Sequence, residues 1–178
     1  MEEVRGSNPL GPTKFIYSMK RRNYYSWDET FMQMCRIIAQ RSKDPNTQTG
    51  ACIVSDENII ISFGYNGFPR GCDDDELPWD REGKYAKTKY PYVVHAEANA
   101  ALNATHNTGG AKMYCNLFPC NECTKVIIQK GIKEVIYESD KYHDNKETIA
   151  SRKMLDLAGV RYRQYIPVHN LVDAKSKK

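Results

Sequence analysis

The sequence predicts an α/β fold in which helices cover both faces of a sheet. Strand-like and helical patterns alternate from residue 95 onward, which favours parallel strands joined by helices. Before that point, two β-rich runs stand close enough together to form an antiparallel hairpin. The 178 residues suffice for one domain with a hydrophobic core.

The first half of the chain contains one helix and the hairpin. Residues 26–29, "SWDE", form a capping box that begins a helix reaching about Ser42. Apolar residues recur in it at helical spacing, namely Phe31, Met34, Cys35 and Ile38. The hairpin strands are "TGACIVS" and "NIIISFGYN". A long polar stretch follows at 66–90, and connections of this length are often functional.

The second half alternates between helix and strand. The alanine-rich run "HAEANAALNA" predicts a helix, and "AKMYCNLF" a short strand. The helix "NECTKVIIQKG" ends at Gly131, and the strand "KEVIYES" follows. The last pair is the helix "DNKETIASRKMLDLAG", closed by Gly159, and the strand "VRYRQYI".

Composition and charge indicate a globular protein. Apolar residues make up 40% and charged residues 27% of the chain. No apolar run approaches the length of a membrane span, and the first residues lack the apolar core of a secretory signal, so we expect a cytoplasmic location. The net charge of +4 comes with basic residues gathered at 20–22 and 175–178. We interpret them as solvated termini rather than a nucleic-acid contact.

These patterns divide the chain into three parts. We expect a flexible N-terminal segment at 1–23, a domain at 24–167 and a basic C-terminal tail at 168–178. Three of the six cysteines lie in apolar runs and are predicted to be buried free thiols: Cys35, Cys52 and Cys115.

The motif that carries chemistry joins "HAE" at 95–97 to "PCNEC" at 119–123. His95 stands at one predicted helix start, and Cys120 and Cys123 stand at the next. Two thiolates and an imidazole suit Zn²⁺, and three protein ligands leave a fourth position open, as in catalytic zinc sites. We expect Glu97 to reach past the helix end to a water on the zinc and to take its proton.

Each half of this motif has another interpretation when taken alone. A Cys-x-x-Cys pair can be a redox pair or half of a structural zinc knuckle, and His-x-Glu alone indicates little. Together, in this order, they match the zinc deaminase signature H-x-E…P-C-x-x-C. A purely structural zinc is the remaining alternative.

At these residues the chain resembles the cytidine deaminase superfamily, and within it the deoxycytidylate (dCMP) deaminases. The resemblance covers about residues 26–165 and rests on "SKDPNTQTGACIV", "GYNGFPRGC", "YPYVVHAEANA", "LFPCNEC" and "SDKYHD". It implies a three-layer α/β/α domain with a mixed five-stranded sheet. It also implies hydrolysis of dCMP to dUMP and ammonia, which supplies dUMP for thymidylate synthesis.

The resemblance also implies roles for individual residues. Water activated by zinc attacks carbon 4 of the cytosine ring. Glu97 protonates ring nitrogen 3 and then the departing amino group, and the backbone N–H of Ala96 binds the ring carbonyl. Asn66 in "GYN" reaches the bound nucleoside, unless it is only a turn residue. Tyr142 in "DKYHD" contacts substrate, unless it is a core or surface tyrosine.

Arg41 is the predicted ligand of the 5′-phosphate, because an arginine can grip phosphate bidentately. A solvated arginine ending a helix is the alternative. The resemblance further implies a homohexamer activated by dCTP with Mg²⁺ and inhibited by dTTP. The effector region then maps onto Gly64, Tyr65, Gly67 and the loop beyond.

That loop holds Cys72 and the acidic run 73–76, whose oxygens suit Mg²⁺, although a solvated charge run is the simpler interpretation. Cys72 has no obvious histidine or cysteine companion nearby, so we expect one zinc per chain. The helix after His95 departs from the family pattern at Ala98 and Asn103. The allosteric prediction is therefore weaker than the prediction of deamination.

Two rival functions share the zinc motif. One is a base deaminase acting on nucleic acid, of the tRNA adenosine deaminase type, which flips its base out of the stack. The segments "GYNGFPRGC" and "SDKYHD" and the modest charge argue against it. The other is a non-catalytic, zinc-stabilised nucleotide-binding protein, and the presence of Glu97 argues against that.

Overall fold

Residues 20–167 are described in the computed structural model of this chain. The predicted basic tail at 168–178 and most of the predicted flexible segment at 1–23 lie outside the described residues. Residues 20–23 are exposed and form neither helix nor strand.

The five strands form one mixed sheet in the order β2-β1-β3-β4-β5. β1 pairs antiparallel with both β2 and β3, whereas β4 is parallel to β3 and β5. The predicted hairpin, the parallel strands and the mixed five-stranded sheet are therefore confirmed. The strands are β1 (Gly50–Val54), β2 (Ile60–Tyr65), β3 (Lys112–Leu117), β4 (Glu134–Ser139) and β5 (Arg161–Gln164).

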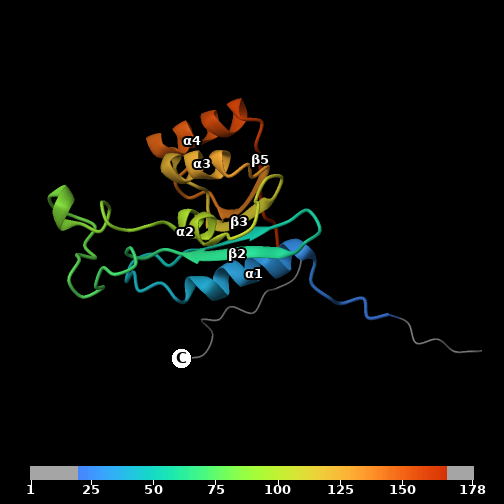
Figure 1. The fold of residues 1–178 in the computed structure, drawn as a ribbon, viewed down its shortest axis with the longest axis horizontal. Helices are drawn as coiled ribbons and strands as arrows, with labels where there is room; N and C mark the ends of the chain where they lie inside the picture. Colours follow the sequence, from blue (N-terminus) through green and yellow to red (C-terminus); the bar gives the residue numbers. More distant parts are fainter. Residues whose placement is uncertain (1–19, 168–178) are drawn as a thin grey trace, which may run out of the picture.

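Helices cover both faces of the sheet, as predicted. Figure 1 shows α1 on one side of the sheet and α2, α3 and α4 on the other. The helices are α1 (Trp27–Ala39), α2 (Ala96–Asn103), α3 (Asn121–Gln129) and α4 (Lys146–Leu157), and a short 3₁₀ turn, η1, spans Tyr85–Lys87. No helix among residues 20–167 is long and apolar enough to cross a membrane.

Each face of the sheet has its own core because side chains alternate along a strand. In β1, Ala51 and Ile53 join the core beneath α2, α3 and α4. Cys52 and Val54 join the core beneath α1. The predicted burial of three free thiols is confirmed for Cys35, Cys52 and Cys115. Burial raises the pKa of the Cys52 thiol to about 12, so it stays neutral.

Helix α1 begins with the predicted capping box. The Glu29 N–H donates to Ser26 Oγ at 3.2 Å, and the Ser26 N–H donates to Glu29 Oε2 at 2.8 Å. The helix ends at Ala39, earlier than the predicted Ser42, because the next residues tighten into turns that donate to carbonyls three residues back.

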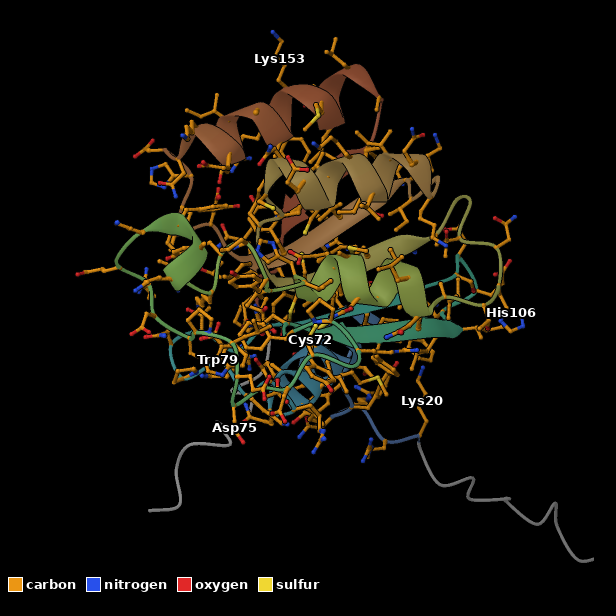
Figure 2. The ribbon with its side chains drawn as sticks, turned by 60° about the vertical axis from the view of Figure 1, so that its left-hand side comes forward. Lys20, Cys72, Asp75, Trp79, His106 and Lys153 are labelled. Carbon is orange, nitrogen blue, oxygen red and sulfur yellow. The ribbon has the colours of Figure 1, made fainter. Side chains whose placement is uncertain are left out.

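The long connection after β2 returns close to where it starts. Gly67 and Val94 form an isolated bridge with N–H···O distances of 3.1 and 2.9 Å. Within the loop, the rings of Phe68 and Trp79 stack with centroids 4.0 Å apart. Figure 2 shows Cys72, Asp75 and Trp79 on this loop, and its return at Val94 leads directly into His95 at the start of α2.

Candidate active site

His95, Cys120 and Cys123 form a cluster of metal-ligating side chains. Their ligand atoms all lie within 4.8 Å of one another. His95 Nδ1 is 3.3 Å from Cys120 Sγ and 3.4 Å from Cys123 Sγ. Ligands that bind zinc tetrahedrally at about 2.0–2.3 Å stand a little over 3 Å apart, so the spacing and the donor set both fit Zn²⁺.

Two helix starts bring this cluster together. His95 is the N-cap of α2, and Cys120 is the N-cap of α3. Cys123 lies in the first turn of α3 and is buried. The positive ends of both helices therefore meet at the cluster, which favours ionised thiols. For Cys123 the hydrogen bond with Cys120 and burial act the other way and raise its pKa.

Hydrogen bonds within the cluster couple the protonation of its side chains. Hydrogen bonds from Cys123 and His95 lower the pKa of Cys120 to about 4. The bond with Cys120 raises the pKa of His95 to about 9. A metal ion bound by these residues would displace the proton that they share.

Glu97 lies beside the cluster in the first turn of α2. It is buried, and its Oε2 is 3.7 Å from Cys123 Sγ. Burial raises the pKa of this carboxyl, although the nearby charge of His95 partly offsets the effect. A carboxyl with a raised pKa exchanges protons closer to neutral pH, which suits a general acid and base.

A pocket of about 520 Å³ opens over this cluster. Five of the predicted site residues line it: Asn66, His95, Glu97, Cys120 and Tyr142. Phe118 and Leu117 add apolar surface, and Asp44, Thr47, Thr49, Arg81, Lys89 and Tyr90 form polar parts of the wall. A small, partly apolar pocket with converging polar groups is typical of a small-molecule site.

Asn66 is built into the pocket wall. Its Oδ1 accepts the Thr49 N–H at 2.8 Å, and its Nδ2 donates to the Thr47 carbonyl at 2.9 Å and to Asp44 Oδ2 at 3.3 Å. Both amide hydrogens therefore have partners within the protein. A nucleoside contact through Asn66 would use the remaining lone pair of Oδ1, and this role stays a prediction.

Arg81 and Lys89 are cationic side chains of the pocket wall, whereas the predicted phosphate ligand Arg41 is not. Arg41 is exposed just past the end of α1, and within residues 20–167 it is not part of the pocket lining. Arg81 and Lys89 do line the pocket, and Arg81 Nε donates to the Tyr90 hydroxyl at 3.3 Å. Sequence reasoning missed both, although they belong to the polar stretch 66–90 that it marked as functional. The phosphate role of Arg41 stays a prediction.

The predicted effector residues occupy the end of β2 and the turn after it. Gly64 faces α2 so closely that a Cβ there would lie 2.2 Å from the Ala96 carbonyl oxygen. The Tyr65 carbonyl accepts from Asn99 Nδ2 at 2.8 Å, and Gly67 forms the bridge to Val94. These contacts give the segment a packing role, and its effector role stays a prediction.

The acidic loop beyond lies at the surface, and Cys72 is exposed there. Asp74 pairs with Lys43. Binding of Mg²⁺ here and the single zinc per chain stay predictions.

Comparison with known proteins decides the family. The profile of the family described as "Cytidine and deoxycytidylate deaminase zinc-binding region" matches residues 25–139, more than half of the chain. The chain belongs to this deaminase family. Its prediction as a deaminase enzyme is therefore confirmed.

Similar proteins within the deaminase family cover most of the chain. Deoxycytidylate deaminase of Homo sapiens is 56% identical over 83% of this chain and 84% of its own length. A probable deoxycytidylate deaminase of Drosophila melanogaster is 51% identical over 94% of this chain and 86% of its own length. The crystal structure of dCMP deaminase from cyanophage S-TIM5 in complex with dCMP and dUMP shares 25% identity, with a TM-score of 0.61 over 77% of this chain and 95% of that one.

Proposed function

We propose that this chain catalyses the zinc-dependent hydrolysis of dCMP to dUMP and ammonia. The main supporting observation is the cluster of His95, Cys120 and Cys123 at two helix starts, beside a pocket that His95, Cys120 and Glu97 line. Similarity to deoxycytidylate deaminases over most of the chain supports dCMP as the substrate. Within the cell the product would supply thymidylate synthesis.

His95, Cys120 and Cys123 would hold the zinc. Bound there, zinc would supply Lewis-acid activation of a water molecule near neutral pH. The cytosine ring enters the pocket with carbon 4 toward this cluster and against the apolar surface of Phe118 and Leu117. Glu97 is buried at the pocket wall, so a cytosine ring that fills the pocket would keep bulk water from its carboxyl group.

Glu97 performs the proton transfers. As carboxylate it takes a proton from the attacking water and delivers it to ring nitrogen 3. It then takes the remaining proton of the hydroxyl group now on carbon 4 and delivers it to the departing amino group. The overall reaction consumes one water and releases ammonia. Ala96 is the first residue of α2, so its backbone N–H has no acceptor within the helix, and we assign this N–H to the ring carbonyl. Ala96 is buried and, within the described residues, is not itself part of the pocket lining.

The full proposal also includes control by nucleotides. In this proposal the chain assembles into a homohexamer that dCTP with Mg²⁺ activates and dTTP inhibits. Its support is the resemblance of the segment around Gly64, Tyr65 and Gly67 to the effector region of the family. Assaying the enzyme with dCMP alone, with dCTP and Mg²⁺, and then with dTTP tests this part.

Replacement of Glu97 by glutamine tests the catalytic assignment. Glu97→Gln keeps the shape but cannot shuttle protons, so turnover of dCMP should fall by at least about 10²–10⁴-fold while the zinc content stays at that of the wild type. Glu122→Gln is the matched control, because Glu122 lies exposed in the first turn of α3 and pairs with Lys125. Near-normal turnover by Glu97→Gln would remove Glu97 from this role.

A comparison of three substrates distinguishes the rival functions. Ammonia release is measured with dCMP, deoxycytidine and a tRNA hairpin. Activity on the hairpin alone would favour the nucleic-acid deaminase. Bound zinc without ammonia from any nucleotide would favour the non-catalytic alternative.

A further inference from the structure

A buried ion pair forms part of the pocket wall. Lys89 Nζ pairs with Asp44 Oδ2, and the two side chains are only 8% and 1% exposed. Both residues line the pocket, although they lie 45 positions apart in the sequence. Burying two charges is costly unless further hydrogen bonds compensate them. The groups that hydrogen-bond to Asp44 and Lys89 therefore show which segments the ion pair holds in place.

Asp44 connects the turn after α1 to the end of β2. Its Oδ1 accepts the backbone N–H groups of Asn46 at 2.8 Å and Thr47 at 3.1 Å. Its Oδ2 accepts Lys89 and, at 3.3 Å, the side-chain amide of Asn66. One carboxylate therefore fixes both the turn and Asn66, and both of these line or border the pocket.

Lys89 anchors the chain that leads into the active site. Its N–H donates to the Asp80 carbonyl at 2.9 Å, and its carbonyl accepts the N–H groups of Tyr92 and Val93, both at 3.0 Å. Val94 then pairs with Gly67, and His95 follows. A shift of Lys89 would therefore be passed to the start of α2.

We propose that Asp44 and Lys89 are positioning residues. Their buried ion pair fixes the position of Asn66 in the pocket wall relative to His95 and Glu97. The pair is neutral as a whole, so its contribution to the site is geometric rather than a net charge offered to substrate. The kinetic test of this inference rests on the proposed deamination of dCMP. A second test, which measures hydrogen–deuterium exchange of backbone amides, does not require activity.

Three variants separate positioning from stability. Lys89→Met and Asp44→Asn each leave one buried charge unpaired, so both should lower Tm and raise the KM for dCMP. The double variant Asp44→Asn/Lys89→Met carries no buried charge, and the side-chain amide oxygen that it introduces can still accept the two turn N–H groups. It should regain most of the Tm while kcat/KM stays down by about 10–100-fold, mainly through KM, with wild-type zinc content.

A neighbouring exposed pair provides the control. Lys43 and Asp74 join the same turn to the acidic loop, but their side chains are 64% and 29% exposed. The variant Lys43→Met/Asp74→Asn should keep both Tm and the KM for dCMP. A double Asp44/Lys89 variant whose KM recovers together with its Tm would overturn the positioning role, as would single variants with a normal KM.

Hydrogen–deuterium exchange of the zinc-loaded protein gives the second readout. The amides of residues 46–49 and 92–95 should exchange faster in the double variant than in the wild type, by more than its small remaining loss of Tm explains. Unchanged exchange would overturn the inference even if dCMP is not the substrate. Absence of wild-type turnover on dCMP would refute the proposed function, and the exchange result would then decide the role of the pair.

Discussion

Gly64→Ala should impair both folding and catalysis because α2 lies directly against β2 at this residue. A Cβ at Gly64 would stand 2.2 Å from the Ala96 carbonyl oxygen and 2.2 Å from the Ala100 nitrogen. These are backbone atoms, which cannot rotate away. To reach ordinary van der Waals separation, α2 must retreat by about 1 Å or more.

The expected losses of stability and of kcat/KM follow from the packing of α2 and from the catalytic residue at its start. Overpacking of this kind costs about 1–3 kcal/mol, and each kcal/mol lowers Tm by about 2–4 °C in a chain of this length. Glu97 lies in the first turn of α2 next to Ala96, and His95 is the N-cap of the same helix, so the same shift moves both side chains relative to Cys120 and Cys123. A misplacement of about 1 Å can cost about 10²-fold in rate, so we expect kcat/KM for dCMP to fall to that extent.

The assay combines thermal unfolding, zinc content and dCMP kinetics on Gly64→Ala. Gly67→Ala is the control for stability, because a Cβ there would meet nothing closer than Tyr65 Cε2 at 3.8 Å, and its Tm should not change. Wild-type Tm and kcat/KM in Gly64→Ala would refute the packing argument. A normal basal rate with a lost response to dCTP and Mg²⁺ would instead favour the effector role of Gly64.

Three further predictions concern phosphate, pH and metal. If the pocket wall binds the 5′-phosphate, Arg81→Ala should raise the KM for dCMP more than the KM for deoxycytidine. The same measurement on Arg41→Ala tests the phosphate contact predicted for Arg41. For either variant, an equal change in both KM values would exclude a phosphate contact by the replaced arginine. Burial alone would raise the pKa of Asp28, but hydrogen bonds from Arg163 and Tyr114 outweigh it and lower the pKa. Ionised Asp28 therefore stabilises the fold above its unfolded pKa, and urea unfolding should show a cost for Asp28→Asn at pH 7 that shrinks below about pH 4; a cost independent of pH would contradict this. Removing metal with a chelator should abolish ammonia release and lower Tm, and zinc should restore both, whereas full activity without zinc would refute the metal assignment.

The sequence by itself determined the order and type of the elements, because the signals involved are local. The capping box at Ser26 and Glu29 and the period of apolar residues in α1 depend only on near neighbours in the chain. The cluster of His95, Cys120 and Cys123 could also be predicted, because each part is a short motif at a helix start. The sequence predicts a later end for α1 than the structure has, because helix termini tighten into turns that no sequence pattern marks clearly.

The tertiary structure alone decided which polar residues form the pocket wall. No local pattern pairs Asp44 with Lys89, shows that both hydrogens of the Asn66 amide are used, or brings Arg81 into the lining in place of Arg41. These contacts depend on the path of the loop between β2 and α2, which the Gly67–Val94 bridge returns to the sheet edge. Short-range motifs predict the reacting groups, whereas contacts between distant segments set the shape and charge of the space around them, because those contacts exist only once the chain has folded.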